Sequence, residues 1–407
     1  MILENHILEK YNIKLYNNDY SIYDVISSFL LNNQNEQPFY IIDIGEIIKA
    51  YEKWIICFPN IKPYYAVKCN PNPVILDVLY RLGTNFDCAS ENEMKLVLDL
   101  TEDPNKIIFA NPCKMTSQIK YARANDVDMM TFDCEEELYK IKLYHPYANL
   151  ILRLSVDDSH SLCKFNSKFG CKLENIEYLI HIIKVLKLSL IGFSFHVGSG
   201  CKSTESYYKA IQTCREAYDI ALKNNIQVNI IDIGGGFPGI NLDNDINIEK
   251  ISQKINEAQK FFFEKEIKEG IIKFIAEPGR YFVEKSHTLV LNVIGKKRET
   301  LDENNESETT IIYYLNDGIY GSFNCMVFDY KKPIILPFNE RNEKKMFKSK
   351  IFGPTCDSID LITKEVYLPE LTIGEWVYVE NFGAYTTAAS SSFNGFITTD
   401  YKYILRN

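Results

Sequence analysis

The chain has 407 residues, of which 46% are apolar and 24% are charged, and its formal net charge at pH 7 is −9. This length allows two or three domains, and an acidic chain without a dense Lys/Arg block is not expected to bind nucleic acid or an anionic membrane surface. The first residues, MILENHILEK, are interrupted by Glu4 and Glu9 and do not resemble a signal peptide, and no apolar run approaches the ~18 residues of a membrane span. We therefore predict a cytoplasmic protein without nucleic-acid or membrane partners.

The sequence signals of a barrel begin after residue 44. Residues 1–44 predict short strands and one helix, SIYDVISSFLLNN, and end in the apolar segment PFYIIDI. From Gly45 to about Phe282, short apolar runs alternate with amphipathic segments, which is typical of βα units around a parallel sheet. Eight such units favour a closed (β/α)₈ barrel over an open doubly wound sheet. The predicted strands are residues 64–69, 85–88, 107–110, 129–132, 150–154, 191–196, 229–233 and 273–276.

After Phe282 the sequence becomes β-like, in segments such as HTLVLNVIG, TTIIYYLND and WVYVENF, and no long helix is predicted. The polar stretch KKRETLDENNESETT, about residues 296–310, is expected to be an exposed loop or hairpin tip. We therefore predict an α/β protein with two domains. Residues 45–283 would form the barrel, and residues 1–44 with residues 284–407 would form a mostly antiparallel β domain, a β-sandwich or β-barrel.

Polar and glycine residues gather where the predicted barrel strands end, and active sites of barrel enzymes lie at these ends. A lysine at such an end is by itself more often a solvated residue. Burial, however, lowers the pKa of an amine and makes it a nucleophile that can react with an aldehyde cofactor. The residues at the strand ends are Lys68, Asp87, Asn111, Arg153, His196 to Ser199, Asp232 to Gly236 and Glu277 to Arg280, and their coincidence favours a cofactor site.

Two turns with glycine are candidates for holding a phosphate. DIGGGFPG and EPGR each follow a predicted strand, and glycines let backbone N–H groups approach an anion closely. The glycine run matches neither the dinucleotide pattern nor the P-loop, and a plain tight turn stays the alternative. Glu277 could keep a pyridinium nitrogen protonated, which makes a pyridoxal ring an electron sink, or it could form a structural salt bridge. His196 could stack on such a ring, although a lone histidine is more often structural.

The predicted β domain adds three candidate residues. Cys356 lies in the turn-like segment GPTCDSID, where an exposed thiol can donate a proton. Asp329 and Asp357 could bind an amine, although each alone is more often a solvated surface acid. The eleven cysteines form no CxxC pair, so neither a zinc site nor a disulfide framework is predicted, and no metal is expected.

Eight motifs in order resemble one family. They are PYYAVKCN, FDCAS, HVGSGC, DIGGGFPG, EPGRYFV, NDGIYGSFNCMVFDY, GPTCDSID and ENFGAYTTAASSSFNGF. Together they are similar to the eukaryotic ornithine decarboxylases of the alanine racemase-like fold-type III pyridoxal-phosphate family, and the resemblance covers roughly residues 20–396. It implies decarboxylation of L-ornithine to putrescine, in polyamine biosynthesis, with pyridoxal 5′-phosphate as cofactor. It also implies a homodimer in which each site is completed by residues of the partner chain.

The resemblance assigns a role to each matching residue. Lys68 would form the Schiff base with the cofactor, Glu277 would hold the pyridinium nitrogen, and Cys356 would reprotonate the substrate α-carbon after CO₂ leaves. His196 would stack on the ring. The other implied cofactor residues are Asp87, Arg153, Ser199, Gly234, Gly235, Gly236, Gly279, Arg280 and Tyr385, with Glu93 in support. The implied substrate residues are Asp329, Asp357, Phe328, Tyr320 and Phe393.

Other functions stay open. Lysine, arginine or diaminopimelate could replace ornithine, although relatives that accept arginine carry glutamate at the position of Asp329, and diaminopimelate needs a cation for its distal carboxylate. Phe328 also departs from the family, because the animal enzymes usually have tyrosine there. A non-catalytic protein similar to the antizyme inhibitors would have lost residues that are present here, and an antizyme-like regulator is a further candidate partner. A related barrel racemase would place an arginine, not Glu277, at the ring nitrogen.

Overall fold

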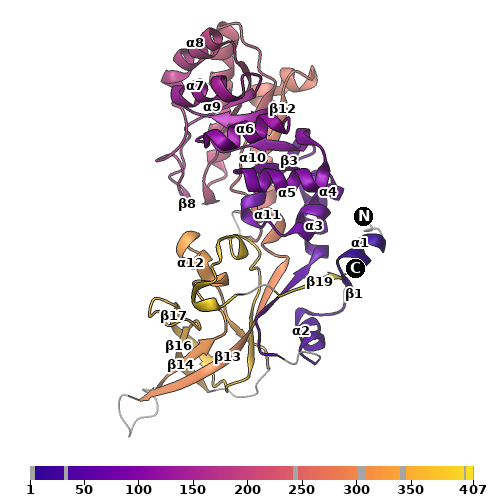
Figure 1. The fold of residues 1–407 in the computed structure, drawn as a ribbon, viewed down its shortest axis with the longest axis vertical. Helices are drawn as coiled ribbons and strands as arrows, with labels where there is room; N and C mark the ends of the chain where they lie inside the picture. Colours follow the sequence, from indigo (N-terminus) through magenta and orange to yellow (C-terminus); the bar gives the residue numbers. More distant parts are fainter. Residues whose placement is uncertain are drawn as a thin grey trace. The chain divides into compact units, whose positions relative to one another are not determined.

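The computed structural model describes residues 5–31, 35–241, 246–300, 309–339, 345–397 and 400–406. The chain divides into two compact units, one of residues 50–282 and one of residues 1–49 with residues 283–407. The indigo N-terminal segment and the yellow C-terminal segment belong to the same unit (Figure 1). We call the two parts the barrel unit and the β unit.

The barrel unit is a closed barrel of eight parallel strands, which confirms the predicted (β/α)₈ barrel. Neighbouring strands around the barrel are β11 (Ile230–Asp232), β12 (Lys273–Ala276), β3 (Ile61–Ala66), β4 (Asn85–Cys88), β5 (Ile107–Phe109), β6 (Met129–Phe132), β7 (Asn149–Arg153) and β9 (Ser189–Ser194). The helices are α4 (Pro73–Leu82), α5 (Glu91–Thr101), α6 (Thr116–Ala124), α7 (Glu135–Tyr144), α8 (Ile176–Leu186), α9 (Glu205–Lys223) and α10 (Ile248–Lys268). Shorter elements are η1 (Val67–Cys69), η2 (Pro104–Lys106), η3 (Leu173–Asn175), and the paired strands β8 (Ser161–Cys163) and β10 (Ser199–Cys201).

Local sequence sets the ends of the barrel helices, as α4 illustrates. The Asn72 side chain accepts a hydrogen bond from Val74 N at 3.0 Å, and Pro73 occupies the first turn, where its missing N–H costs nothing. Gly83 ends the helix with a φ of +102°, which glycine adopts without strain. Since Asn72 follows the η1 turn closely, this cap holds the turn at the end of strand β3.

The β unit is built on a mixed, mostly antiparallel sheet, as predicted. Strand β2 pairs with β13 on one side and with β19 on the other, so residues near both ends of the chain share this sheet. The longest path through the sheet is β1 (Lys14–Tyr16), β19 (Asp400–Arg406), β2 (Phe39–Asp43), β13 (His287–Thr300), β14 (Thr309–Leu315), β16 (Met346–Phe352) and β17 (Leu361–Pro369). Off this path, β18 (Trp376–Val379) pairs with β13 and with β15 (Leu336–Pro337). Helical elements are α1 (Asn5–Lys10), α2 (Ile22–Leu30), α12 (Cys325–Phe328), η5 (Ser322–Asn324), η6 (Thr387–Ala389) and η7 (Phe393–Gly395). At the unit boundaries lie α3 (Ile44–Cys57) and α11 (Arg280–Val283).

The stretch at residues 296–310, predicted to be an exposed loop or hairpin tip, is strand at both of its ends. Strand β13 runs on to Thr300, and the pairs from Lys296 with Tyr313 to Thr300 with Thr309 join it to β14. The charged side chains are accommodated because Lys296 and Arg298 both form ion pairs with Glu370. The centre of the stretch, residues 301–308, lies outside the described residues.

Candidate active site

Lys68 lies in a short turn and not in the strand itself. Strand β3 ends at Ala66, and Lys68 is the middle residue of η1, between the fully buried Val67 and Cys69. Its amine forms an ion pair with the fully buried carboxylate of Asp87 on β4, while the lysine side chain keeps 40% of its surface exposed. The turn thus anchors the backbone and leaves the amine accessible.

Two carboxyl groups lie close to this amine. Burial raises the pKa of Asp87, although the charges of Lys68 and Arg153 act in the opposite direction. Asp87 Oδ1 has no hydrogen-bond partner among the described residues. Glu93, in the first turn of α5, accepts a hydrogen bond from Ala89 N at 2.6 Å, and burial raises its pKa too. Asp87 is therefore placed to exchange a proton with the Lys68 amine.

The glycine run after β11 forms a turn that other residues would disrupt. Gly234 and Gly236 have φ values of +62° and +95°, in the left-handed region that disfavours side chains. A Cβ on Gly235 would lie 2.8 Å from Glu277 O and 2.9 Å from His196 Nε2. The backbone of the turn therefore packs closely against its neighbours. A turn of this kind can offer its backbone N–H groups to an anion.

The EPGR turn packs against the turn that carries Lys68. Ala66 N donates a hydrogen bond to Pro278 O at 3.2 Å, and a Cβ on Gly279 would lie 2.9 Å from the Cβ of Cys69. Arg280 then begins α11. The lysine turn and the second predicted phosphate turn are thus neighbours in the barrel unit.

His196 is held as a neutral ring. Its Nδ1 accepts a hydrogen bond from Gly198 N at 2.9 Å, so the proton of the neutral imidazole lies on Nε2. Burial lowers the pKa of His196 well below its ordinary value, and the charges of Arg153 and Lys68 add to the effect. The ring meets Phe165 edge to face, with 4.9 Å between ring centroids. Ser199, which follows in β10, pairs with Cys163 of β8.

Glu277 belongs to a buried group of charges. Burial raises the pKa of Glu277 well above its ordinary value, and the neighbouring carboxylates of Asp232 and Asp87 raise it further. Burial also raises the pKa of Asp232 to about 7. Arg153, at the end of β7, faces this group, and its guanidinium lies 5.1 Å from the centroid of the Phe169 ring. The sequence placed Asp232 among the residues at the strand ends but assigned it no role in the site.

This set of side chains fits pyridoxal phosphate. The Lys68 amine suits the aldehyde of the cofactor, and the buried carboxyl of Glu277 suits its ring nitrogen. The glycine turn suits its phosphate, because any Cβ in the turn would fill the space. The neutral ring of His196 suits the face of an aromatic cofactor. The described residues contain no group of three His, Cys, Asp or Glu side chains that could hold a metal ion.

The β unit brings a second group of predicted residues together. The Tyr320 hydroxyl donates a hydrogen bond to Asp357, and the rings of Tyr320 and Phe393 stack with 4.4 Å between centroids. Cys356 is exposed, and its N–H donates to Asn394 Oδ1 at 3.0 Å. Tyr320, Asp357, Phe393 and Cys356 therefore form one surface cluster, which we call the thiol cluster.

Asp360 and Asn394 hold the thiol cluster but were not predicted. The fully enclosed carboxylate of Asp360 accepts hydrogen bonds from Ile319 N at 2.8 Å and from Thr355 N at 3.0 Å. It thereby links the segment before Tyr320 to the segment before Cys356. The sequence offered one weak signal for Asn394, which is that an asparagine stands there in a polar loop that contains glycine.

The structure places the other predicted β-unit residues on separate elements. Asp329 follows α12 directly, with its N–H donating to Cys325 O at 3.0 Å, and Phe328 ends this helix with 68% of its surface exposed. Tyr385 takes a left-handed backbone conformation with a φ of +56°.

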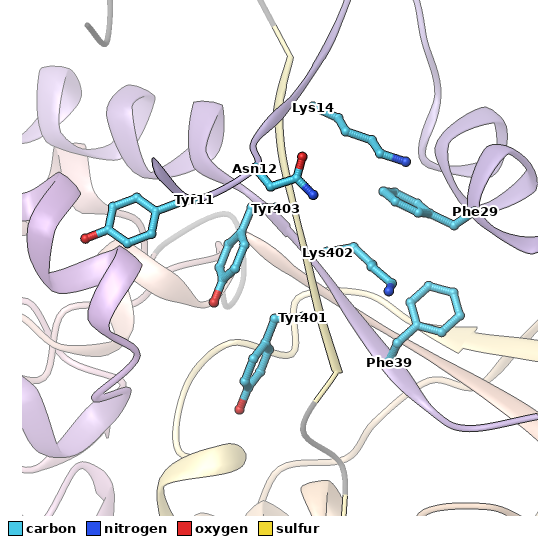
Figure 2. Close-up of a pocket in the computed structure, with 8 residues that line it drawn as sticks. All are labelled: Tyr11, Asn12, Lys14, Phe29, Phe39, Tyr401, Lys402 and Tyr403. Carbon is cyan, nitrogen blue, oxygen red and sulfur yellow. The ribbon is translucent and has the colours of Figure 1, made fainter. Parts of the chain in front are cut away.

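A cavity of ≈340 Å³ in the β unit has no predicted site residue in its lining (Figure 2). It is lined by Tyr11, Asn12, Lys14, Phe29, Phe39, Tyr401, Lys402 and Tyr403. The Lys14 ammonium lies 4.4 Å from the centroid of the Phe29 ring, and Lys402 is ion-paired with Asp400 at 2.8 Å. Across the described part of the chain, no helix combines the length and the apolar character needed to cross a membrane.

Comparison with known proteins gives concordant matches. The family described as "Pyridoxal-dependent decarboxylase, pyridoxal binding domain" matches residues 44–284. The probable ornithine decarboxylase of Dictyostelium discoideum is 44% identical over 394 residues, which span 94% of this chain and 82% of the relative. Antizyme inhibitor 2 of Xenopus laevis is 43% identical over 91% of this chain and 82% of its own length. The solved arginine decarboxylase of Paramecium bursaria Chlorella virus, bound to agmatine, superposes with a TM-score of 0.86 at 35% identity, over 94% of this chain and all of that one.

Proposed function

Since the chain belongs to the pyridoxal-dependent decarboxylase family, and its relatives include an ornithine and an arginine decarboxylase, we propose that it converts L-ornithine to putrescine and CO₂. The main structural support for ornithine as the substrate is the carboxylate of Asp357. Hydrogen bonds from Tyr320 and from Ile359 N lower the pKa of Asp357, so it is ionised at neutral pH. An ionised carboxylate beside two stacked aromatic rings suits the terminal ammonium of ornithine.

The barrel residues would hold the cofactor. Bound pyridoxal phosphate supplies an electron sink for the charge that CO₂ leaves behind. Lys68 would bind its aldehyde and Asp87 would exchange protons with the lysine amine. The Gly234 to Gly236 turn, Gly279, Arg280, Ser199 and Tyr385 would hold its phosphate, Glu277 its ring nitrogen, and His196 its ring face, with Arg153 balancing the buried carboxylates.

The thiol cluster would serve the substrate. Cys356 would deliver a proton to the α-carbon of the substrate once CO₂ has left, and Asp357 with Asp329 would hold the distal ammonium. Phe328, Tyr320 and Phe393 would surround the methylene chain. Phe328 offers no hydroxyl, so its contribution would be packing alone.

We further propose that two chains assemble and share their sites. A large exposed apolar patch would mark an interaction site, and exposed apolar side chains are frequent in the segments that carry or adjoin the thiol cluster. They are Val327, Phe328, Tyr330, Ile359, Phe393, Phe396 and Ile397, and we call them the apolar patch. A second chain would cover the patch, and Cys356 of one chain would then act with Lys68 of its partner.

The test is CO₂ release by purified protein with pyridoxal phosphate, measured in parallel with ornithine, lysine, arginine and diaminopimelate. Release from ornithine well above the other three supports the proposal. Preferred release from arginine or lysine would keep the reaction and reject the substrate. Tyr320→Phe gives a matched variant, because it removes the hydroxyl from Asp357 and keeps the stacked ring, so KM for ornithine should rise more than kcat falls.

The similarity to antizyme inhibitor 2 favours a second candidate, a non-catalytic chain that binds an antizyme-like regulator. The presence of Lys68, Glu277, His196 and Cys356 argues for catalysis. If purified protein develops no cofactor absorbance with pyridoxal phosphate and releases no CO₂ from any of the four substrates, the second candidate replaces the first.

A further inference from the structure

Two acidic side chains meet where the barrel strands β11 and β12 end. These strands are hydrogen-bonded neighbours, with Asp232 opposite Ile275, and Glu277 N donates to Gly234 O at 2.7 Å. Asp232 Oδ1 accepts a hydrogen bond from Gly234 N at 2.9 Å, whereas no donor among the described residues reaches its buried Oδ2. The carboxyl of Glu277 lies close enough to that of Asp232 for the two groups to affect each other's pKa, as the charges of Asp87 and Arg153 also do.

Chemistry requires a proton in this arrangement. Ionised carboxylates only accept hydrogen bonds and repel each other, so two of them can bond only when one is protonated. Pairs of this kind share a single proton in other proteins because both groups cannot ionise at close range. A proton held between the two carboxyl groups would give the buried Oδ2 of Asp232 the hydrogen-bond partner that it otherwise lacks.

The surrounding charges favour a retained proton. Lys68 and Arg153 supply two positive charges, whereas Asp87, Asp232, Glu277 and the neighbouring Glu93 supply four negative charges if all ionise. Protonation of one of these carboxyls lowers the excess of negative charge, which burial favours. The groups that face the pair are Asp87 on β4, Arg153 on β7, Lys68 in η1, Tyr64 on β3, Cys214 on α9 and, near Lys68 and Arg153, the neutral His196 after β9.

We propose that Asp232 and Glu277 share one proton in the cofactor-free protein, and that a cation bound against Glu277 displaces this proton to solvent. The inference rests on the proposed pyridoxal-phosphate site, because the protonated ring nitrogen is the cation in question. The charge is balanced, because the cation brings one positive charge into the site and the displaced proton takes one away. Asp232 remains ionised and keeps its hydrogen bond from Gly234 N. Asp232 is then a positioning residue, which sets the charge of Glu277 without touching the cofactor.

The first test is the infrared spectrum of the cofactor-free protein, recorded at about pH 6 and about pH 8.5 on either side of the expected titration. The wild type should show a protonated-carboxyl band at about pH 6 that is lost at about pH 8.5, and Asp232→Asn and Glu277→Gln should both lack this pH-sensitive band. Asp77→Asn is the matched control, since Asp77 is equally buried but ion-paired with Arg81 at 2.6 Å. The control should keep the band. A wild type without the band, or Asp232→Asn with it, overturns the proposal.

The second test measures protons directly and does not depend on the band. The probe is 4-deoxypyridoxine 5′-phosphate, which has the ring nitrogen and the phosphate but no aldehyde for Lys68. Calorimetry near pH 6.5 in buffers of different ionisation enthalpy gives the protons released on binding. The wild type should release more than Asp232→Asn, by up to about one proton. The proton of the phosphate itself is common to both and cancels.

Equal release from the two proteins overturns the proposal. Neither test uses an amino-acid substrate. A failure of the shared-proton proposal can therefore be distinguished from a failure of the proposed ornithine decarboxylation. If the probe binds neither protein, the cofactor site itself is refuted, together with the inference that rests on it.

Discussion

Replacing Gly235 by alanine would put a methyl group into the turn proposed to hold the cofactor phosphate. The new Cβ would lie 2.8 Å from Glu277 O and 2.9 Å from His196 Nε2. The Glu277 carbonyl is backbone and cannot rotate away, so the turn itself must shift. Overpacking of this kind costs about 1–3 kcal/mol. If the strain is borne by the cofactor-binding conformation, the affinity for pyridoxal phosphate falls by about 5–150-fold.

The assay is an equilibrium titration of cofactor-free protein with pyridoxal phosphate, followed by absorbance. Gly270→Ala is the control, because Gly270 also sits in a strained position, with a φ of +70°, but a Cβ there meets nothing within 4 Å. This control should lose about 1 kcal/mol of stability and no affinity. Wild-type affinity in a folded Gly235→Ala variant would refute the assignment of the turn.

Three further predictions concern the thiol, the shared proton and a buried ion pair. Cys356→Ala should keep cofactor binding but slow putrescine formation and divert turnover to a ketone or aldehyde, as product analysis would show; normal putrescine output rejects its role. Folding raises the pKa of Asp232 from the ordinary 3.8 to about 7, so the folded cofactor-free protein binds the proton more tightly and its stability falls as pH rises between these values. Asp232→Asn should flatten that fall in a series of melting temperatures, and an unchanged slope counts against the shift. Glu137→Ala should cost about 3–5 kcal/mol in denaturant unfolding, because it strips the fully buried Lys114 of its partner at 2.8 Å. Glu174→Ala, which breaks an exposed pair at 3.9 Å, should cost nothing measurable, and equal losses would contradict the reasoning.

The sequence was most informative where pattern and chemistry coincide. Each of the eight barrel strands was predicted within a few residues, because short apolar runs between amphipathic segments leave few other folds. The first strand illustrates the limit, because it was predicted to end at Cys69 and ends at Ala66. Val67 and Cys69 are as buried as strand residues, so hydrophobicity does not show that the chain has already turned into η1.

Other features depend on contacts between distant segments, which no local pattern records. The run at 296–300 looked solvated because its charges are numerous, and Glu370, which pairs with two of them, lies far along the chain. Asp232 looked like an ordinary strand end until its neighbour Glu277 was in place. Asn394 and Asp360 hold Cys356 and Tyr320 through backbone groups, and such bonds can be read only from the fold.

The central claim is that the cofactor residues of the barrel unit and the thiol cluster of the β unit form one decarboxylase site shared between two chains. Mixing Lys68→Ala protein with Cys356→Ala protein tests it most directly, with putrescine formation from ornithine as the readout. Each variant alone should be nearly inactive in this assay. After exchange of chains, the mixture should recover about a quarter of the wild-type rate, because half of the dimers are mixed and each has one intact site. A mixture no more active than its components would contradict the account.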